Sequence, residues 1–148
     1  MQIVAKENIR LGVRAAGWEE AIREAGRLLL QSGQIREAYI DHMIQSVKTL
    51  GPYIVIIPGV AIAHARPDET VLAEGVSVIT LEKAVAFGNP DNDPVDIVWA
   101  FAARSNNGHL ETIARLSRFL ENDRDLALLR QASDADFAYR LINRTAQP

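Results

Sequence analysis

The stretch Val95–Ala103 constrains the fold more than any other part of the chain, because every residue in it except Asp96 is apolar. A strand without polar–apolar alternation is typical of the centre of a sheet that is covered on both faces. Such a sheet needs a layer of helices on each side. The rest of the chain must therefore supply both the neighbouring strands and the covering helices.

Further strand-like segments lie before the central run. Ile9–Arg14 and Gly75–Leu81 alternate apolar and polar side chains, which indicates half-exposed strands. Tyr53–Ile57 is β-branched and aromatic and predicts a short buried strand that Pro58 and Gly59 then bend. Two shorter runs complete the expected set, Val60–Ile62 and Ala84–Phe87.

Two amphipathic helices are expected in the first third of the chain. The first begins at Trp18 and stops near Gly33, with its apolar side chains on one face. The second ends at Gly51, and its predicted inner face consists of Ile35, Tyr39, Met43, Val47 and Leu50. His42 lies at the edge of that apolar stripe, where we interpret it as a packing or partly exposed residue.

Three more helices are expected after the central strand. The first starts near His109, capped by Asn107 or Gly108, and its inner face includes Leu110, Ile113, Leu116 or Ser117, and Leu120. A short helix follows over Asp125–Arg130. Ser133–Asp136 then resembles a capping box that opens a last helix, with Phe137, Leu141 and Ile142 directed inward. The sequence predicts one α/β domain over residues 1–148, a mixed β-sheet flanked by helices.

Composition and charge exclude several classes of function. The 148 residues include 48% hydrophobic residues, enough for one sizeable core. The net charge of −3 provides no attraction to nucleic acid, and the absence of cysteine removes thiol nucleophiles and zinc–thiolate sites. Because the N-terminus lacks a signal-peptide pattern and no apolar run approaches a membrane span, we expect a cytoplasmic protein. No cofactor is expected.

One histidine is well placed for chemistry. His64 ends the stretch Gly59–Pro67, where a short apolar strand meets a loop that Pro67 keeps from continuing as regular structure. A rigid junction between strand and loop positions a nucleophile or ligand. A histidine that only fills space at a strand end fits the same residues, and the local pattern does not separate the two.

His109 provides a potential partner for His64. It lies at the beginning of the helix after the central strand, where free backbone N–H groups and the helix dipole favour anions. If the strands before His64 and His109 are parallel neighbours, both imidazoles reach one edge of the sheet. One ring could then act as nucleophile while the other donates a hydrogen bond to an oxyanion. Phosphoryl transfer suits this pair, because a neutral imidazole attacks phosphorus without first losing a proton.

Other interpretations remain open. The two histidines with Asp68 or Asp93 could form a metal site of two histidines and one carboxylate, or both histidines could be structural. The segment Gly88–Pro94 reads as a solvated turn rather than a calcium loop, since it lacks the glycine and distal glutamate of such loops. No Gly-rich phosphate loop ending in Lys-Ser/Thr is present, so ATP is not expected as the direct donor.

The same residues carry a family resemblance. Gly51–Val55 and Pro58–Pro67, followed by Phe87-Gly88, Asn92–Val95 and His109-Leu110, resemble the active-site region of enzyme IIA components of the bacterial phosphotransferase system. The likeness is to the mannitol/fructose-type fold and, through Ala65-Arg66-Pro67, to its ascorbate-type subgroup.

This resemblance implies a phosphoryl carrier. His64 matches the phosphorylated histidine, which accepts the group from the histidine phosphocarrier protein. It passes the group to a cysteine of enzyme IIB, which serves the membrane enzyme IIC in carbohydrate uptake. His109 matches a second histidine that assists the phosphoryl group. Lys48 falls near where some relatives place an arginine of the same pocket, and a surface lysine is the alternative description.

One position departs from the family pattern, and two questions stay open. Ala63 stands where many relatives have proline, which predicts a somewhat freer loop before His64. Docking near His64 could use Val60, Ile62 and Val85, although these could equally be core residues. A free-standing regulator, whose phosphorylation state controls a protein partner, remains the alternative to transport, and exposed sheet edges permit a homodimer.

Overall fold

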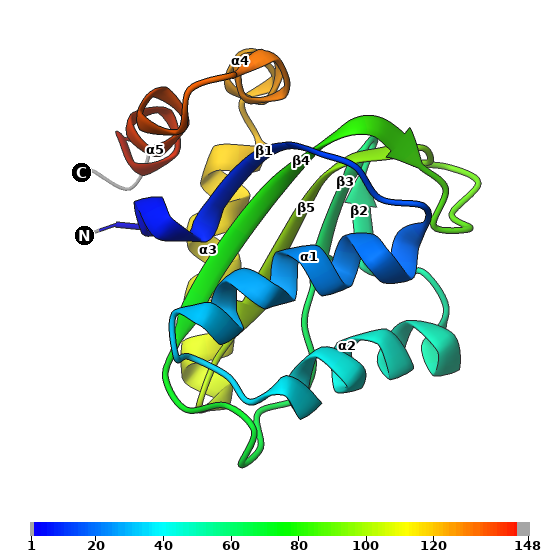
Figure 1. The fold of residues 1–148 in the computed structure, drawn as a ribbon, viewed down its shortest axis with the longest axis vertical. Coiled ribbons are helices and arrows are strands. Elements are labelled where there is room, and N and C mark those ends of the chain that lie inside the picture. Colours follow the sequence, from blue (N-terminus) through cyan, green and yellow to red (C-terminus); the bar gives the residue numbers. More distant parts are fainter. Residues whose placement is uncertain (1, 145–148) are drawn as a thin grey trace.

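A computed structural model describes residues 2–144 and shows a mixed five-stranded sheet in the order β1-β4-β5-β3-β2 (Figure 1). The strands are β1 (Ile9–Val13), β2 (Val55–Ile57), β3 (Val60–Ala63), β4 (Gly75–Val85) and β5 (Val95–Ala102). A short 3₁₀ turn, η1 (Lys6–Asn8), precedes β1, and the helices are α1 (Trp18–Gln31), α2 (Glu37–Leu50), α3 (Asn106–Leu120), α4 (Asp123–Gln131) and α5 (Ala135–Arg144). The predicted α/β class with a mixed sheet flanked by helices is confirmed.

Strand β5 lies at the centre of the sheet, as its apolar sequence predicts. It pairs antiparallel with β4 and parallel with β3. Its alternate side chains enter two separate cores: Val98 and Ala100 face α1 and α2, whereas Trp99 and Phe101 pack with the helices of the C-terminal third. Figure 1 shows α1 and α2 over one face of the sheet and α3 over the other.

Two strand predictions were wrong in their bounds, and Gly75–Leu81 is buried from Ser77 to Leu81 rather than half-exposed. Tyr53–Ile57 is not a buried strand: only Val55–Ile57 is extended, at the edge of the sheet, and Ile56 is 45% exposed. Ala84–Phe87 is not a separate strand, because β4 runs on to Val85 through an irregularity in its pairing with β5. In both cases local composition identified extended chain but not its place in the sheet.

Several helix details also differ from expectation. Leu50 and Leu110 are 69% and 65% exposed rather than inward, and Phe137 is 38% exposed. The cap of α3 is Ser105, whose hydroxyl accepts a hydrogen bond from Gly108 N, and not Asn107 or Gly108. Periodicity located the helices correctly, but it could not show that Leu50 at the end of α2 and Leu110 near the start of α3 are exposed.

No helix within residues 2–144 is long and apolar enough to cross a membrane.

Candidate functional site

The topology brings His64 and His109 together at one edge of the sheet. Strands β3 and β5 are parallel neighbours, paired from Val60 with Ile97 to Ala63 with Ala100. His64 follows β3 directly, and His109 lies in the first turn of α3, which begins shortly after β5. The two imidazole ring centroids are 5.2 Å apart and the planes meet at 75°. The sequence-based condition for a histidine pair is therefore met.

Backbone and aromatic contacts fix the His64 ring. Its Nδ1 lies 2.9 Å from the carbonyl oxygen of Ile62. The ring stacks on Phe101, with the ring centroids 5.0 Å apart, and forms a T-shaped contact with Tyr53, with the centroids 5.8 Å apart. A carbonyl oxygen only accepts hydrogen bonds, so Nδ1 must carry the proton. In the neutral ring Nε2 then keeps its lone pair and is the ring nitrogen that is able to act as a nucleophile.

Burial lowers the pKa of His64 below its ordinary value of 6.5, because the half-buried ring loses hydration of its charged form. The Ile62 carbonyl opposes this by stabilising the protonated ring, while His109 adds to the lowering. We expect an NMR titration of the His64 ring to show a midpoint below pH 6.5, so that the nucleophilic neutral form persists in mildly acidic solution. A midpoint above 6.5 would show that the carbonyl bond outweighs burial.

The start of α3 supplies hydrogen-bond donors beside the pair. The Ser105 side chain and carbonyl accept from Gly108 N and His109 N. The N–H groups of Asn106 and Asn107 cannot be satisfied inside the helix, because the first turn has no preceding carbonyls to accept them. The His109 ring forms a T-shaped contact with Phe101, with the ring centroids 5.0 Å apart, so both histidines contact the same buried phenylalanine. The arrangement can bind an anion next to His64.

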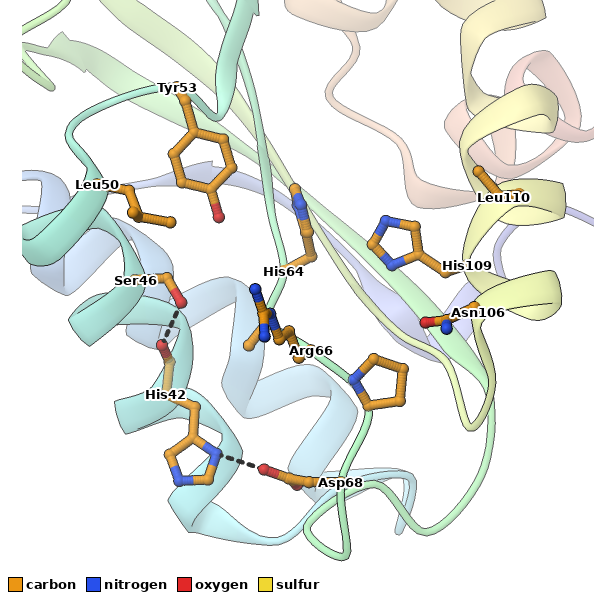
Figure 2. A pocket seen from close by; sticks show the side chains of 12 residues that line it. His42, Ser46, Leu50, Tyr53, His64, Arg66, Asp68, Asn106, His109 and Leu110 are labelled. Carbon is orange, nitrogen blue, oxygen red and sulfur yellow. Dashed lines mark hydrogen bonds and ion pairs between the residues drawn. The ribbon is translucent and has the colours of Figure 1, made fainter.

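The two histidines line a pocket of about 590 Å³ that lies between α2, the loop after β3 and the start of α3 (Figure 2). Its rim is apolar and accessible, since Leu50, Tyr53 and Leu110 are 69%, 44% and 65% exposed. Besides these and the two histidines, the lining consists of His42, Ser46, Ala65, Arg66, Pro67, Asp68 and Asn106.

Sequence reasoning missed the polar wall opposite the histidine pair. His42 Nδ1 lies 3.0 Å from Asp68 Oδ2, and Asp68 Oδ1 accepts a hydrogen bond of 2.8 Å from Thr70 N. Bonding from the Thr70 hydroxyl, followed by its backbone N–H and by His42, lowers the pKa of Asp68. The four-residue spacing of His42, Ser46 and Leu50 on α2 was the available signal, because it defines one helix face beside the buried one.

The structure does not bring Lys48 or Asp93 to this pocket. Lys48 Nζ lies 3.1 Å from Glu19 Oε1 on α1, and Lys48 is not among the lining residues. The Asp93 carboxylate accepts from the N–H groups of Phe87, Gly88 and Asn89 and orders the loop before β5. Within residues 2–144 no three His, Cys, Asp or Glu side chains gather as a potential metal site.

The buried Tyr39 hydroxyl holds the loop that follows His64. It donates to Phe101 O at 2.8 Å and accepts from Ala65 N at 3.0 Å. Burial raises the pKa of Tyr39 to about 12, so the hydroxyl stays protonated. Ala63 is also fixed, since it is 1% exposed and pairs with Ala100 in the sheet. The segment that a proline would stiffen is thus held by strand pairing and by Tyr39.

We expect Tyr39→Phe to lower the free energy of unfolding by about 1–3 kcal/mol, because it leaves Ala65 N and Phe101 O buried without their partner. Denaturant unfolding measures the loss. Tyr139→Phe is the matched control, because the Tyr139 hydroxyl bonds Gln2 at the surface, and its change should stay within about 0.5 kcal/mol. Equal stability losses in both variants would contradict the anchoring role of Tyr39.

Known proteins resemble this chain over nearly its whole length. A family model described as "Phosphoenolpyruvate-dependent sugar phosphotransferase system, EIIA 2" matches residues 2–145. An ascorbate-specific PTS system EIIA component of Escherichia coli (strain K12) is 35% identical over 144 residues, which are 97% of this chain and 94% of that protein.

Two solved structures from Escherichia coli have the same fold. The solution structure of the mannitol-specific cryptic phosphotransferase enzyme IIA matches with a TM-score of 0.87 and 32% identity, covering 97% of this chain and 99% of that chain. A complex of the mannitol enzyme IIA with phosphorylated enzyme IIB contains a chain that matches with a TM-score of 0.84 and 30% identity. The match covers 94% of this chain and 96% of that chain.

Proposed function

This chain belongs to the EIIA 2 family of the phosphoenolpyruvate-dependent sugar phosphotransferase system, and we propose that His64 is the residue on which it carries the phosphoryl group. It is an EIIA phosphoryl carrier, a phosphotransferase that acts through a phosphohistidine. The observation that supports His64 most directly is the 2.9 Å bond from its Nδ1 to Ile62 O, which leaves Nε2 as the nucleophile at the pocket wall.

The proposed donor is the phosphorylated histidine phosphocarrier protein. The lone pair of His64 Nε2 forms a bond to phosphorus, while the bond from phosphorus to the donor's imidazole nitrogen breaks and its electrons return to that nitrogen. The proton on Nδ1 stays there and is held by Ile62 O. The product is an N-phosphoryl imidazolium, whose ring is a good leaving group for the next step.

The proposed acceptor is a cysteine thiolate of an enzyme IIB. Sulfur bonds to phosphorus, the bond to Nε2 breaks, and the electron pair returns to Nε2, which restores the neutral ring. His109 and the N–H groups at the start of α3 face the oxygens of the moving group and stabilise their charge. His109 therefore assists without forming a covalent bond.

Docking would use the apolar rim, defined as Leu50, Tyr53 and Leu110, because these side chains are exposed around the mouth of the pocket. Val60 and Ile62 do not qualify, since both are buried in the core at 0% and 4% exposure. A histidine that must enter a partner's active site benefits from an accessible hydrophobic surround. Enzyme IIB as a partner is supported by the complex of the related mannitol enzyme IIA with phosphorylated enzyme IIB.

We further propose an ascorbate-like carbohydrate as the transported substrate, on the 35% identity to the ascorbate-specific component. Transfer from the phosphorylated chain to an ascorbate-type enzyme IIB and to a mannitol-type enzyme IIB tests this. We expect faster appearance of phosphocysteine on the ascorbate-type protein. Faster transfer to the mannitol-type protein would overturn the substrate class, and transfer to neither would favour the regulatory alternative.

A further inference from the structure

An arginine also lines the pocket. Arg66 lines the same pocket as His64 and lies two residues after it. Among the described lining residues it is the only one that is cationic at every physiological pH, since the others are histidine, acidic, polar or apolar. Figure 2 draws the nitrogen atoms of Arg66 between Ser46 and His64.

The carboxylate in the pocket is engaged elsewhere. Asp68 binds Thr70 through Oδ1 and His42 through Oδ2, so both carboxylate oxygens already have partners away from Arg66. None of the ion pairs formed within residues 2–144 involves Arg66. The Arg66 guanidinium is exposed and can accept an anion without first breaking an ion pair in the described part of the chain.

A phosphoryl group brings a charge of about −1.5 to −2 into this pocket at neutral pH. The start of α3 offers a partial positive charge, on the order of half a unit. Lys48 offers none here, because it pairs with Glu19 outside the lining. A planar guanidinium matches two phosphoryl oxygens at once, which a lysine ammonium does not.

We propose that Arg66 is a phosphoryl-binding residue, whose guanidinium bonds the oxygens of the phosphoryl group carried on His64. The local backbone suits this role. Ala65, between the two residues, is bonded to the Tyr39 hydroxyl, and Pro67 restricts Arg66 to an extended conformation. The proposal rests on the proposed function of His64 and adds a cation that binds the phosphoryl group while it is carried on His64.

The phosphoryl group itself reports this contact. Wild type, Arg66→Gln, Arg66→Lys and Arg104→Gln are loaded with phosphoramidate, so that partner docking does not enter, and the ³¹P chemical shift is followed against pH. Arg104→Gln is the matched control, because Arg104 is exposed near the start of α3 but does not line the pocket. A neighbouring cation favours the more charged phosphoryl form. We therefore expect the midpoint in Arg66→Gln to rise by about 1 pH unit.

Arg104→Gln should titrate like the wild type, and Arg66→Lys should lie closer to the wild type than Arg66→Gln does. Single-turnover transfer from Arg66→Gln should be slower by about 10- to 100-fold. A wild-type titration in Arg66→Gln would overturn the proposal even if transfer were slow, because Arg66 would then act in docking only. Absence of phosphorylation in the wild type would instead refute the function proposed for His64.

Discussion

A His64→Gln variant is expected to take up no phosphoryl group from the phosphorylated histidine phosphocarrier protein, whereas the wild type acquires one that is labile to acid and stable to base. Glutamine roughly preserves the size and polarity of the side chain but offers no nucleophilic ring nitrogen. The expected loss is complete, since among the described lining residues only His64 has a ring nitrogen bonded to a backbone carbonyl, which leaves its other nitrogen free to attack. Incubation followed by intact-protein mass measurement records the added mass.

The variant His42→Gln tests whether another histidine of the same pocket, and not His64, carries the phosphoryl group. His42 lines the same pocket, but it is paired with Asp68 on the opposite wall. This variant should still be phosphorylated. Labelling of His64→Gln together with loss in His42→Gln would move the phosphorylated residue to His42.

The second large effect is expected from His109→Ala. The variant should still be phosphorylated at His64, because Nε2 and its orientation by Ile62 are untouched. Onward transfer to enzyme IIB should slow by about 100-fold, since one preorganised donor to the moving phosphoryl oxygens is lost. Rapid-quench measurement of a single turnover gives the rate.

His109→Gln controls for this loss, because the glutamine amide can still donate a hydrogen bond from the same position in α3. We expect its rate to lie between those of His109→Ala and the wild type. Complete failure of His109→Ala to become phosphorylated, with the fold intact, would mean that the two histidines had been assigned the wrong roles.

The framework of the site could be predicted from the sequence because strong local patterns define it. The uninterrupted apolar run in β5 requires helices on both faces, and the structure places α1 and α2 on one side and α3 on the other. His64 directly follows β3, and His109 lies in the first turn of α3, the helix after β5; both strands could be recognised locally. Their proximity depended on β3 and β5 being parallel neighbours, a pairing that no local pattern specifies.

The remainder of the pocket depends on distances that the sequence does not contain. Leu50 and Leu110 continue the apolar periodicity of their helices, yet both are exposed and line the pocket instead of entering the core. The pairing of His42 with Asp68 joins α2 to the loop after β3, two segments far apart in the chain. Lys48 matched a family position by spacing alone, but its side chain pairs with Glu19 on α1.

The position of phosphorus on the His64 ring tests the central claim most directly. The wild type is phosphorylated with the phosphocarrier protein after ¹⁵N labelling of its histidines, and ³¹P–¹⁵N coupling identifies the bonded nitrogen. Because Nδ1 is committed to Ile62 O at 2.9 Å, we predict that phosphorus is bonded to Nε2 of His64. Phosphorus on Nδ1 of His64, or on His42 or His109, would contradict this assignment.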